Sequence, residues 1–153
     1  MSANFTQAAK SALIEELEQL RDSVHQAAEP LTDAQLWSKP VDPGNSIGHL
    51  LLHLTGNLNH FFGGQLGKTG YMRNREREFT LDRPPARSQL FADYDGAVAT
   101  FRRVVEGLDE AQLLAPHPEA RFGSVYKTLV HLVSHFALHR GQISYLVRLV
   151  KPA

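Results

Sequence analysis

The fold of this chain is decided by its last long stretch, SVYKTLVHLVSHFALHRGQISYLVRLV, residues 124–150. Apolar residues recur along it at intervals of three and four, which is the spacing of the buried face of an α-helix. Ser124 is the expected N-cap, because its hydroxyl can accept a hydrogen bond from a free N–H of the first turn. The residues predicted to be buried are Val125, Leu129, Leu132, Phe136, Ile143, Leu146, Val147 and Val150.

The same stretch places His131, His135 and His139 at steps of four. Each such step turns a helical row by about 40° and climbs about 6 Å, so the outer two members lie about 12 Å apart. Two neighbours can therefore bind one ion together, and the spacing does not choose between the two neighbouring pairs. A lone histidine beside an apolar face is usually a core or boundary residue. Together with a second row of histidines upstream, however, the pattern favours a metal site.

A second row of histidines lies in the stretch NSIGHLLLHL, residues 45–54, where His49 and His53 are four apart. This helix is expected to begin with Asn45 or Ser46 as its cap and to end near Phe62. Five of the eight histidines lie in the two rows. The residues of this second helix that are predicted to be buried are Ile47, Leu50, Leu51, Leu54, Leu58 and Phe61.

Two more long helices are predicted, over residues 4–28 and 88–106, and neither row of histidines falls in them. The first should end at Pro30 and be followed by a short helical turn in residues 31–37, where Trp37 is expected to plug the end of the bundle. The predicted buried face of the first is Phe5, Ala9, Leu13, Leu17, Leu20 and Val24; that of the other is Leu90, Phe91, Tyr94, Val98, Phe101, Val104 and Val105.

Two connections have an ambiguous composition. Residues 71–85 form an arginine-rich loop, which is interpreted either as a solvated connection or as a contact for an anionic substrate or partner near the mouth of the bundle. The sequence does not decide between these interpretations. His117 lies between Pro116 and Pro118, and we expect it to be exposed rather than to bind a metal.

A weak internal repeat divides the chain into two similar halves. The segment LTDAQL, residues 31–36, recurs as LDEAQL, residues 108–113, and each copy precedes a proline-containing loop, a capping serine and a histidine-bearing helix. Aligning the two serines pairs His53 with His131 and Asn57 with His135. We therefore predict an all-α four-helix bundle of up-down helices, a single domain over residues 1–153, with one longer loop between its second and third helices.

Composition narrows the functional classes. The 153 residues include 16 basic and 16 acidic side chains, so no net charge attracts the protein to nucleic acid or to an anionic membrane. The absence of cysteine excludes disulfides, thiolate ligands and a cysteine nucleophile. Neither a signal peptide nor an apolar run of about 18 residues is present, which leads us to expect a soluble cytoplasmic protein.

Three segments together resemble the DinB-like family of bacterial metal-binding four-helix bundles: residues 45–54, REREF at 75–79, and HFALHRGQI at 135–143. The resemblance extends over nearly the whole chain. It implies that His53, His135 and His139 bind a divalent metal ion, and that His49 and His131 are neighbours of that ion rather than ligands. It also implies a homodimer, which the small residues Gly56, Gly63 and Gly64 favour as well.

Three imidazoles suit zinc or nickel, with iron, cobalt, copper and manganese left open, and they leave positions for water or substrate. Relatives in the family include transferases that use low-molecular-weight thiols, so the resemblance implies a metal-dependent thiol S-transferase or a hydrolase. The thiol would be a cofactor such as glutathione, mycothiol or bacillithiol, because the chain has no cysteine. The alternative is a metal-binding protein or sensor without turnover. Haem binding is a third interpretation, although no feature of the sequence requires a porphyrin.

A substrate-sized pocket that opens on the metal would favour an enzyme. A fourth protein ligand that closes the coordination shell would favour a structural or sensing role. The sequence shows neither feature, so it leaves both interpretations open.

Overall fold

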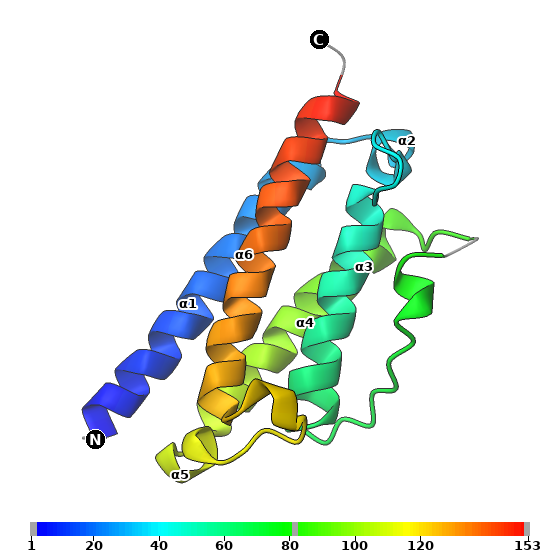
Figure 1. The fold of residues 1–153 in the computed structure, drawn as a ribbon. Helices are drawn as coiled ribbons and strands as arrows, with labels where there is room; N and C mark the ends of the chain where they lie inside the picture. Colours follow the sequence, from blue (N-terminus) through cyan, green and yellow to red (C-terminus); the bar gives the residue numbers. More distant parts are fainter. Residues whose placement is uncertain (1–2, 81–82, 152–153) are drawn as a thin grey trace.

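Four long helices form the frame of the molecule in a computed structural model, which describes residues 3–80 and 83–151 (Figure 1). They are α1 (Ala3–Ala28), α3 (Ile47–Leu58), α4 (Arg87–Gly107) and α6 (Val125–Val150). The shorter elements are α2 (Asp33–Trp37), α5 (Glu110–Leu114), the π-helix η1 (Asn59–Gly64), and the 3₁₀ turns η2 (Glu76–Glu78) and η3 (Ala120–Phe122). The predicted all-α four-helix bundle is confirmed, but its long helices do not alternate up and down along the chain, because α3 and α4 run in the same direction. No helix of the described part of the chain is long and apolar enough to cross a membrane.

The long loop decides how the four helices are arranged. In Figure 1, α1 and α6 lie side by side and run in one direction, whereas α3 and α4 run in the other. The connection between Gly64 and Arg87 travels back along the bundle, so that α4 begins at the same end as α3. As a result α3 contacts α4 on one side and α6 on the other. The contact between α3 and α6 brings the two histidine-bearing helices together.

The internal repeat of the sequence reappears as two matching helix starts. Thr32 and Gln35 form a capping box at α2, and Asp109 and Gln112 form the same motif at α5. Ser46 then caps α3, and Ser124 caps α6. Of the two predicted caps of the second helix, Ser46 is therefore the one observed. Trp37 packs against the start of α3, because its ring lies edge-on to His49 and would block a side chain at Gly48.

The core follows the predicted apolar faces closely. Every residue predicted to be buried in residues 45–62 is buried, and so are Leu17, Val24, Tyr94, Phe101 and Phe136. The prediction was wrong for Phe5, which is 56% exposed. This residue lies in the first turns of α1 and lines a shallow cleft formed by α1, α5 and Tyr126 of α6.

The second predicted helix changes geometry near its end. Regular α-helix stops at Leu58, and residues up to Gly64 continue as a π-helix, rather than the α-helix reaching Phe62. Gly63 and Gly64 lower the preference for α-helix there. Gly63 also has close contacts, since a Cβ on it would lie 3.2 Å from Thr69 and 3.3 Å from Thr100. These glycines thus serve packing within the chain, and the homodimer remains a prediction.

The connection before α6 contradicts one prediction. His117 is only 2% exposed, although its two proline neighbours suggested an exposed loop. The loop folds over the end of the bundle, because the His117 N–H donates to the Gly123 carbonyl at 2.8 Å. The ring then lies between Phe61 and Phe122, with ring centroids 6.2 and 5.6 Å away. This burial lowers the pKa of His117.

Candidate metal centre

Three histidines from two helices meet in the middle of the α3–α6 contact. The Nε2 atom of His135 lies 3.4 Å from that of His53 and 3.0 Å from that of His139. One ring nitrogen from each residue lies within 4.8 Å of the other two. This is the one such group of three possible ligands in the described part of the chain. We call these three residues the histidine triad.

The geometry of the triad fits a divalent ion, and so does the protonation of its two members on α6. Nitrogens about 2.0–2.1 Å from one tetrahedral zinc ion are about 3.3 Å apart, close to the two distances between Nε2 atoms. Burial, with the neighbouring His139 and His53, lowers the pKa of His135 to about 4. Burial also lowers the pKa of His139. Neutral imidazole is the form that binds a metal, so His135 and His139 are in the required state at neutral pH.

Two hydrogen bonds aim the ring nitrogens at a common point. His53 uses its Nδ1 atom to contact Glu78 Oε2 at 2.9 Å, and His139 uses its Nδ1 atom to contact Gln142 Oε1 at 2.7 Å. Because an oxygen acceptor requires the proton on Nδ1, both rings present the lone pair of Nε2. Metal-binding histidines in proteins are oriented in this way by their second ring nitrogen.

The carboxylate behind His53 belongs to a buried ion pair. Arg73 Nε donates to Glu78 Oε1 at 2.7 Å, and Arg73 Nη2 donates to Oε2 at 2.8 Å. Burial opposes ionisation of Glu78, but the hydrogen bonds from Arg73 and His53 outweigh it and lower the pKa of the carboxyl group. Arg73 Nη1 also donates to Asn57 Oδ1 at 3.3 Å. Glu78 is therefore a charged, doubly anchored support for one ligand.

A glycine on α3 makes room for that support. A Cβ atom at Gly56 would overlap the Glu78 carboxylate. Any larger residue there would displace Glu78 from His53 and from Arg73, whose Nε atom donates to the carboxylate oxygen that the Cβ would overlap. Gly56 thus has a defined structural role that its position in an α-helix would not suggest.

The triad borders a cavity of about 340 Å³. His53 and His135 line this cavity together with Asn57, and its other walls contain arginines and aromatic rings. Because three side chains form the triad and no fourth histidine or carboxylate of the described residues joins them, the arrangement leaves coordination positions open. Open positions are typical of catalytic rather than structural zinc sites.

Comparison with known proteins identifies the family. A model of the mycothiol S-transferase family matches residues 12–150, which is most of the chain. The chain belongs to this family. The resemblance to DinB-like proteins is confirmed by the same match and by solved structures. No curated protein matches the chain.

Two solved structures share the fold of this mycothiol S-transferase family member. A conserved protein from Enterococcus faecalis has 17% identity and a TM-score of 0.73, with 98% of each chain covered. YfiT from Bacillus subtilis has 21% identity and a TM-score of 0.70, with 97% of this chain and 89% of YfiT covered. YfiT is described as a probable metal-dependent hydrolase with an unusual four-helix bundle topology. At these identities the similarity shows the fold.

The other two histidines of the rows lie outside the triad of this family member. His49 is buried beside Ser46, whose hydroxyl contacts its Nδ1 atom, and burial lowers the pKa of His49. His131 is exposed and packs on Phe122, with ring centroids 5.2 Å apart. The convergence of His53, His135 and His139 is as the family resemblance implied, and their binding of a metal stays a prediction.

Sequence reasoning missed the residues that support the ligands. Glu78 and Arg73 lie in the loop for which two interpretations were open, and Asn57 appeared only as the repeat partner of His135. Gln142 was part of a family motif without an assigned role. A usable signal was the composition of REREF at 75–79, which combines acidic and basic residues next to an apolar ring. That signal does not say which of its two glutamates turns inward.

Proposed function

We propose that this protein is a metal-dependent transferase that joins a low-molecular-weight thiol to an electrophilic substrate. The observation that carries the proposal is the open histidine triad, which brings three imidazoles together beside the 340 Å³ cavity. Membership in the mycothiol S-transferase family supports a thiol as one substrate. Because the chain contains no cysteine, the sulfur must arrive on a separate molecule.

The ligand set favours zinc or nickel, since both accept imidazole nitrogen. A divalent ion held by the triad would bind the sulfur of the thiol and favour loss of its proton. In the overall reaction, the sulfur forms a bond to a carbon of the electrophile, the bond from that carbon to the leaving group breaks, and the thiol proton passes to solvent.

The chain's own residues keep the site in the required arrangement. Glu78 and Gln142 fix the rings of His53 and His139 through hydrogen bonds to their Nδ1 atoms. Arg73 keeps the Glu78 carboxylate charged, and a charged acceptor makes a stronger hydrogen bond to His53. Phe61 and Phe122 form an apolar wall of the cavity.

The direct test is formation of an S-conjugate. Zinc-loaded protein should accelerate the reaction of mycothiol with 1-chloro-2,4-dinitrobenzene, and removal of zinc should abolish the acceleration until zinc is restored. His139→Gln should lose it as well, whereas Arg148→Gln, an exposed change on the same helix, should keep it. Glutathione and bacillithiol serve as parallel thiols. Full metal binding without conjugate formation with any of the three thiols would contradict the transferase and favour a metal-binding protein without turnover.

A further inference from the structure

Three arginines from two separate loops line the cavity beside the histidine triad. They are Arg73 and Arg75 from the long loop and Arg121 from η3. No aspartate or glutamate is among the residues that line the cavity. The walls also contain Phe61 and Phe122. This cavity thus combines positive charge with an apolar surface.

The three guanidinium groups differ in what already neutralises them. Arg73 is paired with buried Glu78, and Arg121 Nε donates to Glu119 Oε2 at 2.9 Å. Among the described residues, Arg75 has no carboxylate partner. A divalent ion in the triad would add two further positive charges. The cavity therefore has an excess of positive charge, and an anionic ligand would offset it.

Aromatic rings hold the two outer arginines in place. The guanidinium carbon of Arg75 lies 5.4 Å from the ring centre of Phe79, and that of Arg121 lies 4.6 Å from the ring centre of Phe122. Such cation–π contacts limit the motion of a long side chain, so less entropy is lost when the arginine binds a ligand. The planar fork of arginine matches the two oxygens of a carboxylate. Arg75 and Arg121 are exposed, and each can offer its fork of donors to a ligand beside the triad.

We propose that this cavity is a subsite for an organic carboxylate with a small aromatic or apolar body. Arg75 and Arg121 bind the carboxylate, and Phe61 and Phe122 contact the body. If the protein is the proposed transferase, the carboxylate belongs to the electrophilic substrate, and this part of the inference rests on that function. The subsite would then hold that substrate next to the triad, where the sulfur would be bound.

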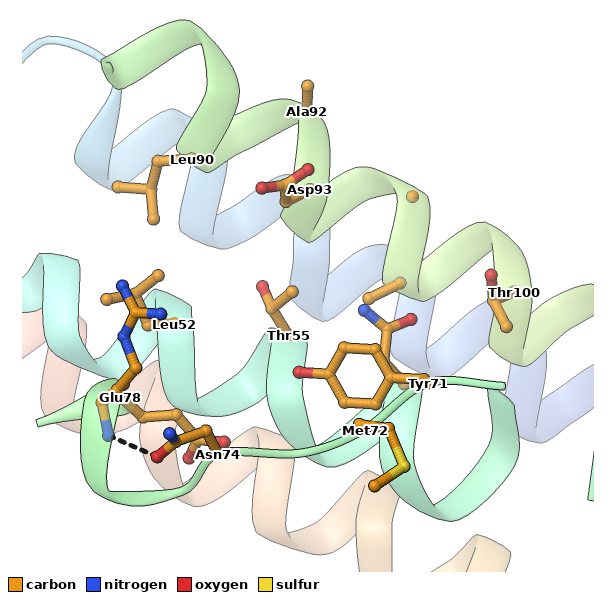
Figure 2. A pocket seen from close by; sticks show the side chains of 14 residues that line it. Leu52, Thr55, Tyr71, Met72, Asn74, Glu78, Leu90, Ala92, Asp93 and Thr100 are labelled. Carbon is orange, nitrogen blue, oxygen red and sulfur yellow. Dashed lines mark hydrogen bonds between the residues drawn. The ribbon is translucent and has the colours of Figure 1, made fainter. Parts of the chain in front are cut away.

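The other cleft formed by the long loop has a different character. It has a volume of about 620 Å³ and lies between α4 and the loop, as Figure 2 shows for Tyr71 and Met72 on the loop and Asp93 and Thr100 on α4. Its one arginine, Arg77, shares the lining with Asp93 and Glu78. Charges of both signs make this cleft a poor anion site. Arg77 therefore provides a matched control on the same loop.

Benzoate and its neutral analogue benzamide test the subsite by calorimetry with zinc-loaded protein. Benzoate should bind at least tenfold more tightly than benzamide, and raising the salt concentration should weaken only benzoate. Arg75→Gln and Arg121→Gln should each weaken benzoate about tenfold. Arg77→Gln should leave it unchanged. Each variant should keep the zinc affinity of the unaltered protein, because none of these arginines contacts the triad.

Direct ligation of benzoate to the zinc ion would give a different pattern. In that case Arg75→Gln would have no effect and removal of zinc would abolish binding, which would overturn the proposal. Equal binding of benzoate and benzamide would overturn it too. These titrations do not involve a thiol, so they can be interpreted even if the transferase assay fails. Conversely, an inactive subsite would not prevent S-conjugation of an uncharged electrophile.

Discussion

The helices α3 and α6 begin in the same way and then serve the site differently. Each follows a capping box, a proline-containing loop and a capping serine. However, α6 continues as regular helix to Val150, whereas α3 passes into a π-helix after Leu58. The two copies share the means of starting a helix, and the residues that follow decide its role.

The difference extends to the histidines. His53 on α3 is 6% exposed and is held by a buried ion pair, whereas His135 and His139 on α6 are only partly buried and Gln142 is the acceptor for His139. In the repeat alignment, His53 corresponds to His131 and His135 corresponds to Asn57. Both His131 and Asn57 line the cavity. Because an amide replaces an imidazole at Asn57, one metal centre is expected rather than two.

Removal of the metal should have the largest effect, a fall in the free energy of unfolding, because the ion would be the strongest link between α3 and α6. Binding to the native state alone adds about 2.7 kcal/mol to the free energy of unfolding at a hundredfold excess over the dissociation constant. Thermal unfolding of stripped and zinc-reloaded protein measures the difference. Identical melting in both states would count against the site.

Loss of the carboxylate that contacts His53 should have the next largest effect. We expect Glu78→Gln to weaken zinc binding about ten- to a hundredfold, because the neutral amide no longer anchors the ring with a charged acceptor. Competition with a coloured chelator measures the affinity. Glu76→Gln is the matched control, since Glu76 is exposed in the same 3₁₀ turn. Equal affinities for the two variants would show that the α3 ligand needs no support.

Gly56→Ala should also weaken zinc binding through Glu78, but to a smaller extent. The added methyl group would displace Glu78 from His53 without touching any ligand, and we expect about a tenfold loss of zinc affinity. Gly96→Ala provides the control, because a Cβ there meets nothing within 4 Å. That second change should stabilise α4 by about 0.5–1 kcal/mol and leave zinc binding intact. A Gly56→Ala variant with normal zinc affinity would refute the crowding argument.

Acid should weaken the metal-free protein through the α6 histidines. The pKa of His135 is lowered from 6.5 to about 4, so between these values the unfolded chain binds more protons than the native protein. The free energy of unfolding should therefore fall as the pH falls from about 6.5 towards 4. His135→Gln should show a shallower decline in denaturant titrations at several pH values. An unchanged decline would mean that His135 titrates normally in the folded state.

The sequence predicted the features that depend on local pattern. Helix positions, both serine caps and most of the core follow from apolar spacing and from short polar side chains at helix starts. The family motif indicated which histidines converge, whereas spacing alone left His131 as eligible as His139. The burial of Glu78, the burial of His117 and the π-helix depend on contacts between distant segments. Such contacts arise from how the long loop and the loop before α6 fold back, and no local pattern encodes that path.

Calorimetric titration of five alanine variants with zinc at one pH tests the central claim most directly. His53→Ala, His135→Ala and His139→Ala should each lower the affinity at least tenfold, or about 1.4 kcal/mol, because each removes a direct bond to the ion. His49→Ala and His131→Ala should lose much less, since neither ring belongs to the triad. If His131→Ala abolished binding while His139→Ala bound zinc normally, the assignment of ligands on α6 would be contradicted.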